Sequence, residues 1–260
     1  MEASAAKPKR GPETEDRYRA PALDKGLDIL ELLSEQPRGL TRGEIVKAMG
    51  RGPSEIYRML ERLVARDYVS RSAEGDRYAL TMKLFMLGHR HPPVRRLVAR
   101  ALPLMDEFAR EAMQSCHLVV PDRSASIVVA QATCPGNWEF GIRVGTPIDL
   151  FGTGSGRTLL AFRDPHPSGH AAIEWQSDAI RAKLSAIEDE LDECRTLGYR
   201  IGASRQIRGV DDISVPILSE SYAIAVLTCP YIQRIDGKEQ PEATYVLALL
   251  KDIAGRLSLS

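Results

Sequence analysis

The residues with the most enzyme-like spacing are the glycine-rich run GTGSGR at 152–157. A serine flanked by glycines can be a nucleophile, and a glycine-rich turn before a helix can bind a phosphate. Thr153 stands where a nucleophile elbow needs glycine, Arg157 stands where a dinucleotide fingerprint needs its third glycine, and no Walker lysine follows. What remains is a turn into a helix at 158–162, whose free N–H groups can attract a carboxylate or another anion. The run predicts either a ligand-anchoring loop or a plain turn.

The histidines and cysteines predict no metal site and no cofactor. His166 and His170 have the spacing of two ligands on one helix, but the prolines and glycine around them favour a loop. His117 lies in an apolar strand-like run, where a hydrogen-bonded core histidine is commoner than a ligand. The four cysteines contain no C-x-x-C pair and are expected to be reduced thiols.

A second group of polar residues suits contact with a polyanion and lies between Leu40 and Leu80. The sequence from Thr41 to Glu44 is a capping box, which predicts a helix that begins at Thr41. The glycines and proline at 50–53 end this helix and turn into a second one near Ser54. Two short helices joined by a tight turn are typical of a helix-turn-helix.

The second helix has separate buried and outward faces. Ile56, Leu60, Leu63 and Val64 recur at three- and four-residue intervals and share the buried face. Outward residues near the start of a recognition helix are the ones that enter the major groove, and Tyr57 and Arg58 are the best candidates. The alternating runs at 68–71 and 77–80 around a Glu74-Gly75-Asp76 turn predict a β-hairpin wing flanked by Arg71 and Arg77.

The charge of the chain is divided between its two ends. The formal net charge of the 260 residues is zero, but residues 1–100 hold 20 Lys+Arg against 14 Asp+Glu, and residues 101–260 hold 15 against 21. A basic front part and an acidic rear part suggest that only the front part faces a polyanion. Without a signal peptide or a run of about 18 apolar residues, we expect a cytoplasmic protein with no membrane partner.

The pattern along the chain predicts two domains of α+β class. Residues 1–20 are polar and are expected to be a disordered tail. A winged helix-turn-helix is expected at 21–87, with a scaffold helix from Pro21 to before Gly39. A helical linker is expected at 88–96, where His91-Pro92-Pro93 interrupts a helix. Residues 97–260 predict a domain with a mainly antiparallel sheet and helices set to one side. Its elements are expected as strands at 117–120, 126–130, 139–144, 207–218 and 222–230, and as helices at 178–197 and 245–257.

This order of features resembles the IclR family of bacterial transcriptional regulators. Four strings carry the resemblance: ALDKGLDILELL, PSEIYRMLERLVARDYV with the wing ending in DRYAL, VGTPIDLFGTGSGRTLLAF, and GYRIGASRQIRGVDDISVPI. The resemblance implies a ligand-responsive regulator of a catabolic operon. In this family a winged helix-turn-helix is joined to a GAF-like α/β effector-binding domain. Homodimers or dimers of dimers bind a palindromic operator in double-stranded DNA, and the effector is a small organic acid or an aromatic metabolite.

The resemblance also implies the positions of both sites. Contacts with DNA are expected from the first helix, the turn, the second helix and the wing, at Thr41, Arg42, Arg51, Ser54, Glu55, Tyr57, Arg58, Arg71 and Arg77. Contacts with the effector are expected at Gly154, Ser155, Gly202, Asp212, Val226 and Thr228. Glu55 stands where small hydroxyl residues are usual, so the operator sequence does not transfer from the family. The alternative is an enzyme acting on a small metabolite with a regulatory front domain, although no nucleophile–base pair supports it.

Overall fold

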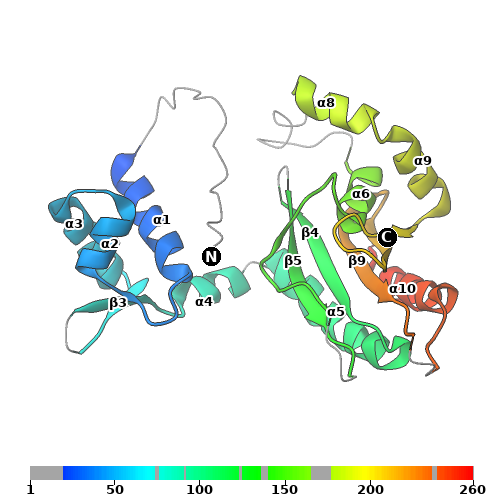
Figure 1. The fold of residues 1–260 in the computed structure, drawn as a ribbon, viewed down its shortest axis with the longest axis horizontal. Helices are drawn as coiled ribbons and strands as arrows, with labels where there is room; N and C mark the ends of the chain where they lie inside the picture. Colours follow the sequence, from blue (N-terminus) through cyan, green and yellow to red (C-terminus); the bar gives the residue numbers. More distant parts are fainter. Residues whose placement is uncertain are drawn as a thin grey trace. The chain divides into compact units, whose positions relative to one another are not determined.

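The computed structural model describes residues 20–73, 76–90, 92–122, 125–135, 140–164, 177–235 and 239–259. The chain divides into two compact units, Met1–His91 and Pro92–Ser260, and each is described by itself (Figure 1). Residues 1–19, Glu74, Gly75, His166 and His170 lie outside the described residues. None of the described helices combines the length with the apolar character that a bilayer crossing requires.

The first unit is a winged helix-turn-helix. Its elements in chain order are α1 (Pro21–Ser34), β1 (Leu40–Thr41), α2 (Arg42–Met49), α3 (Pro53–Ala65), β2 (Val69–Arg71), β3 (Arg77–Leu80) and α4 (Lys83–Arg90). The three strands form one antiparallel sheet in the order β1-β3-β2, in which the short strand β1 was not predicted from the sequence. The predicted scaffold helix and the two helices of the motif are confirmed.

Local sequence signals set the boundaries of α2 and α3. The Thr41 side chain accepts a hydrogen bond from the Glu44 N–H while the Glu44 carboxylate accepts from the Thr41 N–H, which is the predicted capping box. Gly50 ends α2 in the left-handed conformation that glycine adopts without strain. Pro53 then opens α3 at a position where its missing N–H costs nothing. Ile56 and Leu60 of α3 are buried with Ile45 of α2 in the core of this unit, as the spacing predicts.

The second unit is built on one six-stranded sheet. Its elements are α5 (Pro92–Ala112), β4 (Cys116–Asp122), β5 (Ala125–Ala132), β6 (Pro147–Ile148), α6 (Gly154–Ala161), α8 (Asp178–Ser185), α9 (Glu188–Leu197), β7 (Arg200–Ala203), β8 (Val210–Ser219), β9 (Tyr222–Ile232) and α10 (Ala243–Leu257). The strand order is β6-β5-β4-β9-β8-β7, and neighbouring strands pair antiparallel. The predicted α+β class with a mainly antiparallel sheet is therefore confirmed.

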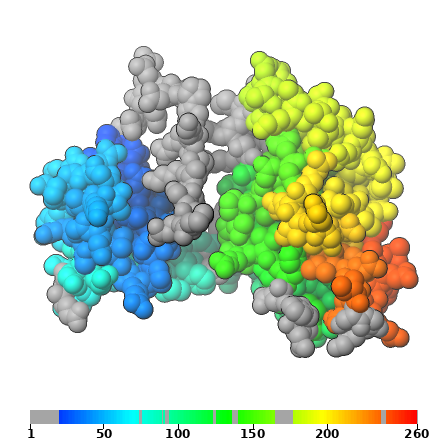
Figure 2. Space-filling view, in the orientation of Figure 1, coloured from blue at the N-terminus to red at the C-terminus, as the bar shows by residue number. Residues whose placement is uncertain are grey.

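Helices cover both faces of this sheet, so the expectation of helices on one side is wrong. Leu118 and Leu227 point into one apolar cluster with α5 and α10, whereas Val119 and Val226 point into another cluster with α6, α8 and α9. Adjacent residues of a strand point to opposite faces of the sheet. Because both faces of this sheet carry apolar side chains, helices must pack on both faces to bury them. Figure 1 shows α6 and α10 on opposite faces, and in Figure 2 the yellow-green atoms of α8 and α9 form an outer layer on this unit.

Three predicted elements of the second unit differ from the structure. The expected helix at 178–197 is two helices with a break at 186–187, which lets Leu184 and Leu191 pack into the same apolar cluster. The described part of the expected strand at 139–144 is irregular, and the edge strand β6 begins after Gly145. The expected strand from Ile207 begins only at Val210, because Gly209 takes a left-handed turn conformation.

Candidate effector pocket and DNA-binding surface

A small cavity of about 110 Å³ lies between the sheet and the start of α6. The helix contributes Thr153 and Ser155, the central strand β4 contributes His117, and β8 contributes Asp212. The rest of its lining is mostly apolar and comes from Phe140, Gly141, Ile142, Ile148, Ser204, Gln206, Ile207, Val210 and Pro230. An apolar cavity with a few convergent polar groups is the usual form of a small-molecule site.

The helix α6 begins earlier than predicted, at Gly154 rather than Thr158. Thr153 caps it, because its hydroxyl accepts from the Gly156 N–H at 3.0 Å. A side chain at Gly156 would meet the backbone of Asp149 and Leu150 at about 2.5 Å, so only glycine lets the helix approach this closely. The glycine-rich run is therefore a capped helix start packed tightly on the chain that precedes it.

A buried row of hydroxyl groups connects this helix to the sheet. The Ser155 hydroxyl donates to Thr228 Oγ1 at 3.0 Å, and Thr228 Oγ1 lies 2.9 Å from Ser214 Oγ. His117 Nε2 lies 3.2 Å from Ser155 Oγ. All four residues are buried. Buried polar groups need hydrogen-bond partners. These four side chains bond to one another, and this network fixes the position of the start of α6 on the sheet.

His117 is neutral, and one of its two ring nitrogens has no hydrogen-bond partner among the described residues. It is 2% exposed, and burial lowers the pKa of its imidazole to about 4. The single proton of Ser155 goes to Thr228, so Ser155 Oγ accepts from His117 Nε2–H. The other nitrogen, Nδ1, is then an unprotonated acceptor, and it has no hydrogen-bond partner within the part of the chain that the structure describes.

Asp212 occupies the helix start that the sequence predicts for an anion. Its carboxylate accepts from the Gly154 N–H at 3.3 Å. Burial raises the pKa of Asp212, and the hydrogen bond from Gly154 and the charge of Arg200 partly offset that rise. A Cβ on Gly154 would lie 2.6 Å from the Asp212 Cβ, so the two chains meet closely here. The chain itself therefore supplies a carboxylate at the start of α6.

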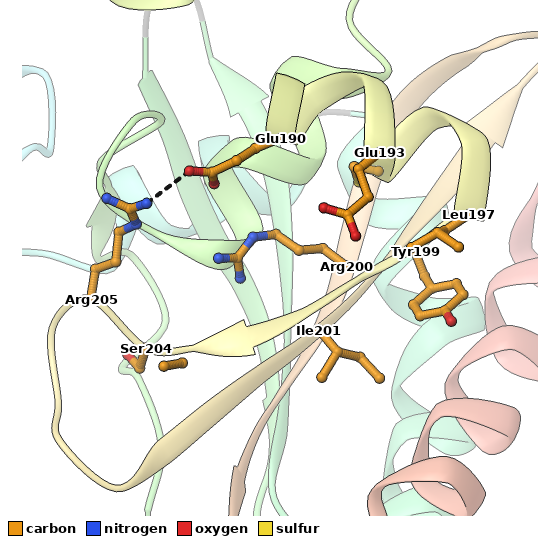
Figure 3. Close-up of a pocket in the computed structure, with 10 residues that line it drawn as sticks. Glu190, Glu193, Leu197, Tyr199, Arg200, Ile201, Ser204 and Arg205 are labelled. Carbon is orange, nitrogen blue, oxygen red and sulfur yellow. Dashed lines mark hydrogen bonds and ion pairs between the residues drawn. The ribbon is translucent and has the colours of Figure 1, made fainter. Parts of the chain in front are cut away.

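A second, larger cavity of about 480 Å³ lies between α9 and the edge strand β7, with Ser204 shared between the two cavities. Figure 3 shows Arg200 extending along it, with the Arg205–Glu190 ion pair (3.0 Å) to one side and Glu193 to the other. Glu190 also pairs with Arg157 of α6, and these arginines lower the pKa of its carboxyl, mainly through the Arg157 hydrogen bond. Arg200 Nη1 is buried and, among the residues that the structure places, has no hydrogen-bond partner.

The predicted effector residues occupy different places around the cavity. Ser155 and Asp212 line it, and Gly154 contacts Asp212. Thr228 lies behind Ser155 as its hydrogen-bond partner. Val226 is buried in the apolar cluster under α6, and Gly202 lies in β7 against the Arg200 side chain; neither lines the cavity.

Sequence reasoning gave His117 a core role and did not select Arg200. The alternation of β4 could have indicated the position of His117. It places His117 on the same face of the sheet as Val119, which packs toward α6. Among the described residues, no group of three or more His, Cys, Asp or Glu side chains could hold a metal ion.

The first unit presents an exposed polar face on α2 and α3. Ser54, Tyr57 and Arg58 of α3 are exposed, and the Arg42 guanidinium of α2 lies 5.5 Å from the centre of the Tyr57 ring. Arg51 is exposed in the turn between the helices, and Thr41 caps α2 with its hydroxyl. Glu55 forms an ion pair with Lys25 of α1 at 3.1 Å, which turns it toward the scaffold helix. Ser54, Tyr57 and Arg58 lie three and four residues apart and so share one face of α3, with Arg42 beside Tyr57. Glu55 and Thr41 are engaged by partners within the unit.

The two wing arginines are held differently. Arg71 lies over the Tyr78 ring, with 5.8 Å between the guanidinium carbon and the ring centre. Arg77 donates to the Gly39 carbonyl at 3.2 Å and lies 3.8 Å from Glu44. Arg77 therefore ties the wing to the start of α2, and a phosphate contact from this side chain would compete with those bonds.

Comparison with known proteins identifies both units. Residues 22–73 match the IclR helix-turn-helix domain, and residues 93–259 match the C-terminal domain of the bacterial transcriptional regulator IclR. The chain is 29% identical over 198 residues to the HTH-type transcriptional regulator KdgR of Escherichia coli, covering 74% of each chain. It is 26% identical over 201 residues to the glycerol operon regulatory protein of Streptomyces coelicolor, covering 75% of this chain and 78% of that one.

Solved structures show the same fold. An IclR homolog of Microbacterium hydrocarbonoxydans, crystallised with 4-hydroxybenzoate, superposes with a TM-score of 0.71 at 20% identity, covering 91% of this chain and 97% of that one.

The family consists of transcriptional regulators and not of enzymes, which removes the enzyme alternative. Two family models together span nearly the whole described chain, from the scaffold helix to α10. The chain belongs to the IclR family of bacterial transcriptional regulators.

Proposed function

We propose that this regulator binds a palindromic operator as a homodimer or a dimer of dimers, and that an effector in the cavity at α6 changes its affinity for that operator. The exposed residues Arg42, Tyr57 and Arg58 support the DNA contact. Tyr57 and Arg58 lie in the first half of α3, the part of a recognition helix that enters a major groove, and Arg42 of α2 lies over the Tyr57 ring. Arg51 and Ser54 extend this surface. Arg71 at the wing would add contacts to the phosphate backbone.

The observation that carries the effector site is the buried row from His117 through Ser155 and Thr228 to Ser214. It places polar groups at the wall of an otherwise mostly apolar cavity, where a small ligand gains both burial and orientation. The related regulator from Microbacterium was crystallised with 4-hydroxybenzoate, which supports an organic acid as the ligand class. The relative in Streptomyces coelicolor is named for the glycerol operon, which supports control of a catabolic operon.

The size of the cavity favours a small organic acid over an aromatic one. Its volume of about 110 Å³ is well below the roughly 300–1,000 Å³ of pockets that hold drug-sized ligands. An aromatic acid would have to displace the 140–142 segment or the 204–207 loop to enter. A small acid fits with less rearrangement.

Effector binding and operator binding would be coupled through α6. A ligand that binds more tightly to one position of this helix increases the population of the conformation with that position. The spacing of the two recognition helices in a dimer is a geometric constraint, so a modest shift changes operator affinity. The test is fluorescence anisotropy on operator DNA selected by this protein from a random pool, with and without small organic acids and 4-hydroxybenzoate. At least one compound should change the dissociation constant about fivefold or more. If every compound that binds the protein leaves DNA affinity unchanged, the proposal fails.

A further inference from the structure

The larger cavity, between α9 and the edge strand β7, is lined by an arginine that the chain leaves without a partner. The side chain of Arg200 extends along this cavity (Figure 3). Within the described part of the chain its guanidinium forms no hydrogen bond and no ion pair, and its Nη1 is buried. A guanidinium carries five N–H donors, and buried donors are nearly always bonded. Arg200 is therefore suited to an acceptor that comes from a ligand.

Two glycines leave the space that this guanidinium occupies. A Cβ on Gly202 of β7 would lie 3.1 Å from Nη2, and a Cβ on Gly154 of α6 would lie 3.1 Å from Nη1. Side chains at these two positions would crowd the guanidinium, because 3.1 Å is closer than ordinary van der Waals contact. The backbone of two neighbouring elements therefore makes a seat for the charged group of Arg200.

The helix α9 supplies a carboxylate that is also without a partner. Glu193 lines the cavity, is exposed, and makes no hydrogen bond or ion pair with the residues that the structure places. Glu190, the other acid of α9 at this cavity, is held by Arg157 and by Arg205. Figure 3 shows Glu193 on the other side of Arg200 from the Glu190–Arg205 pair. The cavity therefore offers a ligand one cation, Arg200, and one anion, Glu193.

The charges around this cavity balance one another. Three arginines and three carboxylates line it or interact with its charged side chains: Arg157, Arg200, Arg205, Glu190, Glu193 and Asp212. A ligand with a net charge would leave one charge uncompensated in a partly enclosed space, where desolvation makes an unpaired charge costly. A zwitterion adds one charge of each sign and keeps the balance. The charges therefore favour a zwitterionic ligand over a simple anion.

The rest of the wall is suited to an apolar group. Leu197 of α9 and Ile201 of β7 are 46% and 43% exposed, so a ligand side chain that covers them removes apolar surface from water. Tyr199 extends this part of the wall. Cys194 and Ser204 are the remaining polar groups named here, and both are uncharged, because burial raises the pKa of the Cys194 thiol and a hydroxyl does not ionise.

We propose that this cavity is a second ligand site, separate from the cavity at α6, and that it binds a free α-amino acid with an apolar side chain. The Arg200 guanidinium pairs with the ligand carboxylate, for which its planar fork is suited. The Glu193 carboxylate accepts from the ligand ammonium group, and the ligand side chain lies against Leu197 and Ile201. The volume of about 480 Å³ lies within the roughly 300–1,000 Å³ of small-molecule pockets.

Three amino acids and their matched analogues test the ligand class. L-Leucine, L-methionine and L-phenylalanine are each compared with the acid that lacks the amino group and the amine that lacks the carboxylate. For leucine these are 4-methylpentanoate and 3-methylbutylamine. Binding to the full chain is measured by titration calorimetry without DNA. At least one amino acid should bind about tenfold or more tightly than both of its analogues, because each analogue leaves one charged group of the site unpaired.

Substitutions at the two charged residues assign each half of the ligand. Arg200→Met removes the cation and should abolish the advantage of the amino acid over the amine. Glu193→Gln removes the anion and should abolish its advantage over the acid. Arg200→Lys keeps the charge without the fork, so it should bind more weakly than wild type and still prefer the amino acid to the amine. A general defect in folding would weaken all ligands alike and would not produce this pattern.

Exposed residues elsewhere in the second unit provide matched controls. Arg181→Met in α8 and Glu107→Gln in α5 remove the same charges away from the cavity and should leave binding unchanged. Circular dichroism melting verifies that each variant is folded. The proposal is overturned if none of the three amino acids binds, or if Arg200→Met and Glu193→Gln leave their binding unchanged. An acid that binds as tightly as its amino acid, with both weakened by Arg200→Met, would make this a simple anion site and would also overturn it.

Discussion

His117 Nε2 of the central strand β4 lies 3.2 Å from Ser155 Oγ of the first turn of α6, and both residues are buried. This contact is one of the buried hydrogen bonds that hold the start of α6 on the sheet. His117 is also one of the residues that line the cavity at α6. A ligand that engages this ring would therefore act on the helix directly.

The neutral state of His117 predicts a pH dependence of stability. Its pKa is about 4 in the folded chain and about 6.5 in an unfolded one, so the unfolded chain binds more protons between these values. Stability should fall as the pH drops from 6.5 to 4, with about 3 kcal/mol lost from this residue. Asp212, whose pKa is raised, contributes the opposite slope.

Urea unfolding of wild type and His117→Asn across this pH range isolates the contribution of the histidine. The variant should be less stable at pH 7 and should show a flatter profile. Identical profiles would mean that the pKa of His117 is the same in the folded and the unfolded chain, which contradicts this account.

The close approach of Gly154 to Asp212 predicts that Gly154→Ala is destabilising. The added Cβ would lie 2.6 Å from the Asp212 Cβ, and one chain must move. We expect a loss of about 1–3 kcal/mol in the free energy of unfolding, as for other overpacked sites. Gly255→Ala in α10 is the matched control, because the added Cβ would meet no atom of the described residues within 4 Å. This substitution should be stabilising by about 0.5–1 kcal/mol. Equal effects of the two substitutions in urea unfolding would contradict this account.

Arg58→Ala should weaken specific operator binding by about 1–3 kcal/mol if the side chain reads a base edge from α3. Arg181→Ala removes the same charge from α8 in the other unit, where the side chain is exposed and pairs with Asp178. The control should leave affinity for the selected operator unchanged in an anisotropy titration. An unchanged affinity in Arg58→Ala would exclude Arg58 from the DNA contact.

Salt should weaken operator binding steeply, because the arginines and lysines of the first unit would release counterions from the DNA backbone. A plot of log affinity against log salt concentration between 50 and 200 mM should be linear with a negative slope, and the slope of Arg51→Ala should be shallower by about one if that residue contacts a phosphate. A flat plot would count heavily against this binding mode.

Much of the fold was predictable from local signals. The capping box at Thr41, the turn at 50–53 and the apolar spacing of Ile56 and Leu60 set α2 and α3 without reference to the rest of the chain. The break at 186–187 and the cover on both sheet faces depend on packing between distant segments, so spacing along the chain could not show them.

The site was less predictable than the fold. Ser155 and Asp212 were identified through the family resemblance, and both line the cavity. The role of His117 depends on Ser155, 38 residues away, which bonds to Nε2, while Nδ1 has no partner among the residues that the structure describes. In sequence it could not be told from a core histidine. Val226 faces the same side of the sheet as His117, but it packs in the apolar cluster under α6 and does not line the cavity.

The central claim is that effector binding at α6 and operator binding are coupled, and titration calorimetry of one ligand against two forms of the protein tests it most directly. The ligand is whichever of glycerate, lactate, glycerol and 4-hydroxybenzoate binds the full chain tightest. It is titrated into free protein and into protein saturated with selected operator DNA. Coupling predicts dissociation constants that differ about five- to 150-fold, matched by the same factor in the operator affinity. Equal dissociation constants for the free and the operator-bound protein would contradict the account.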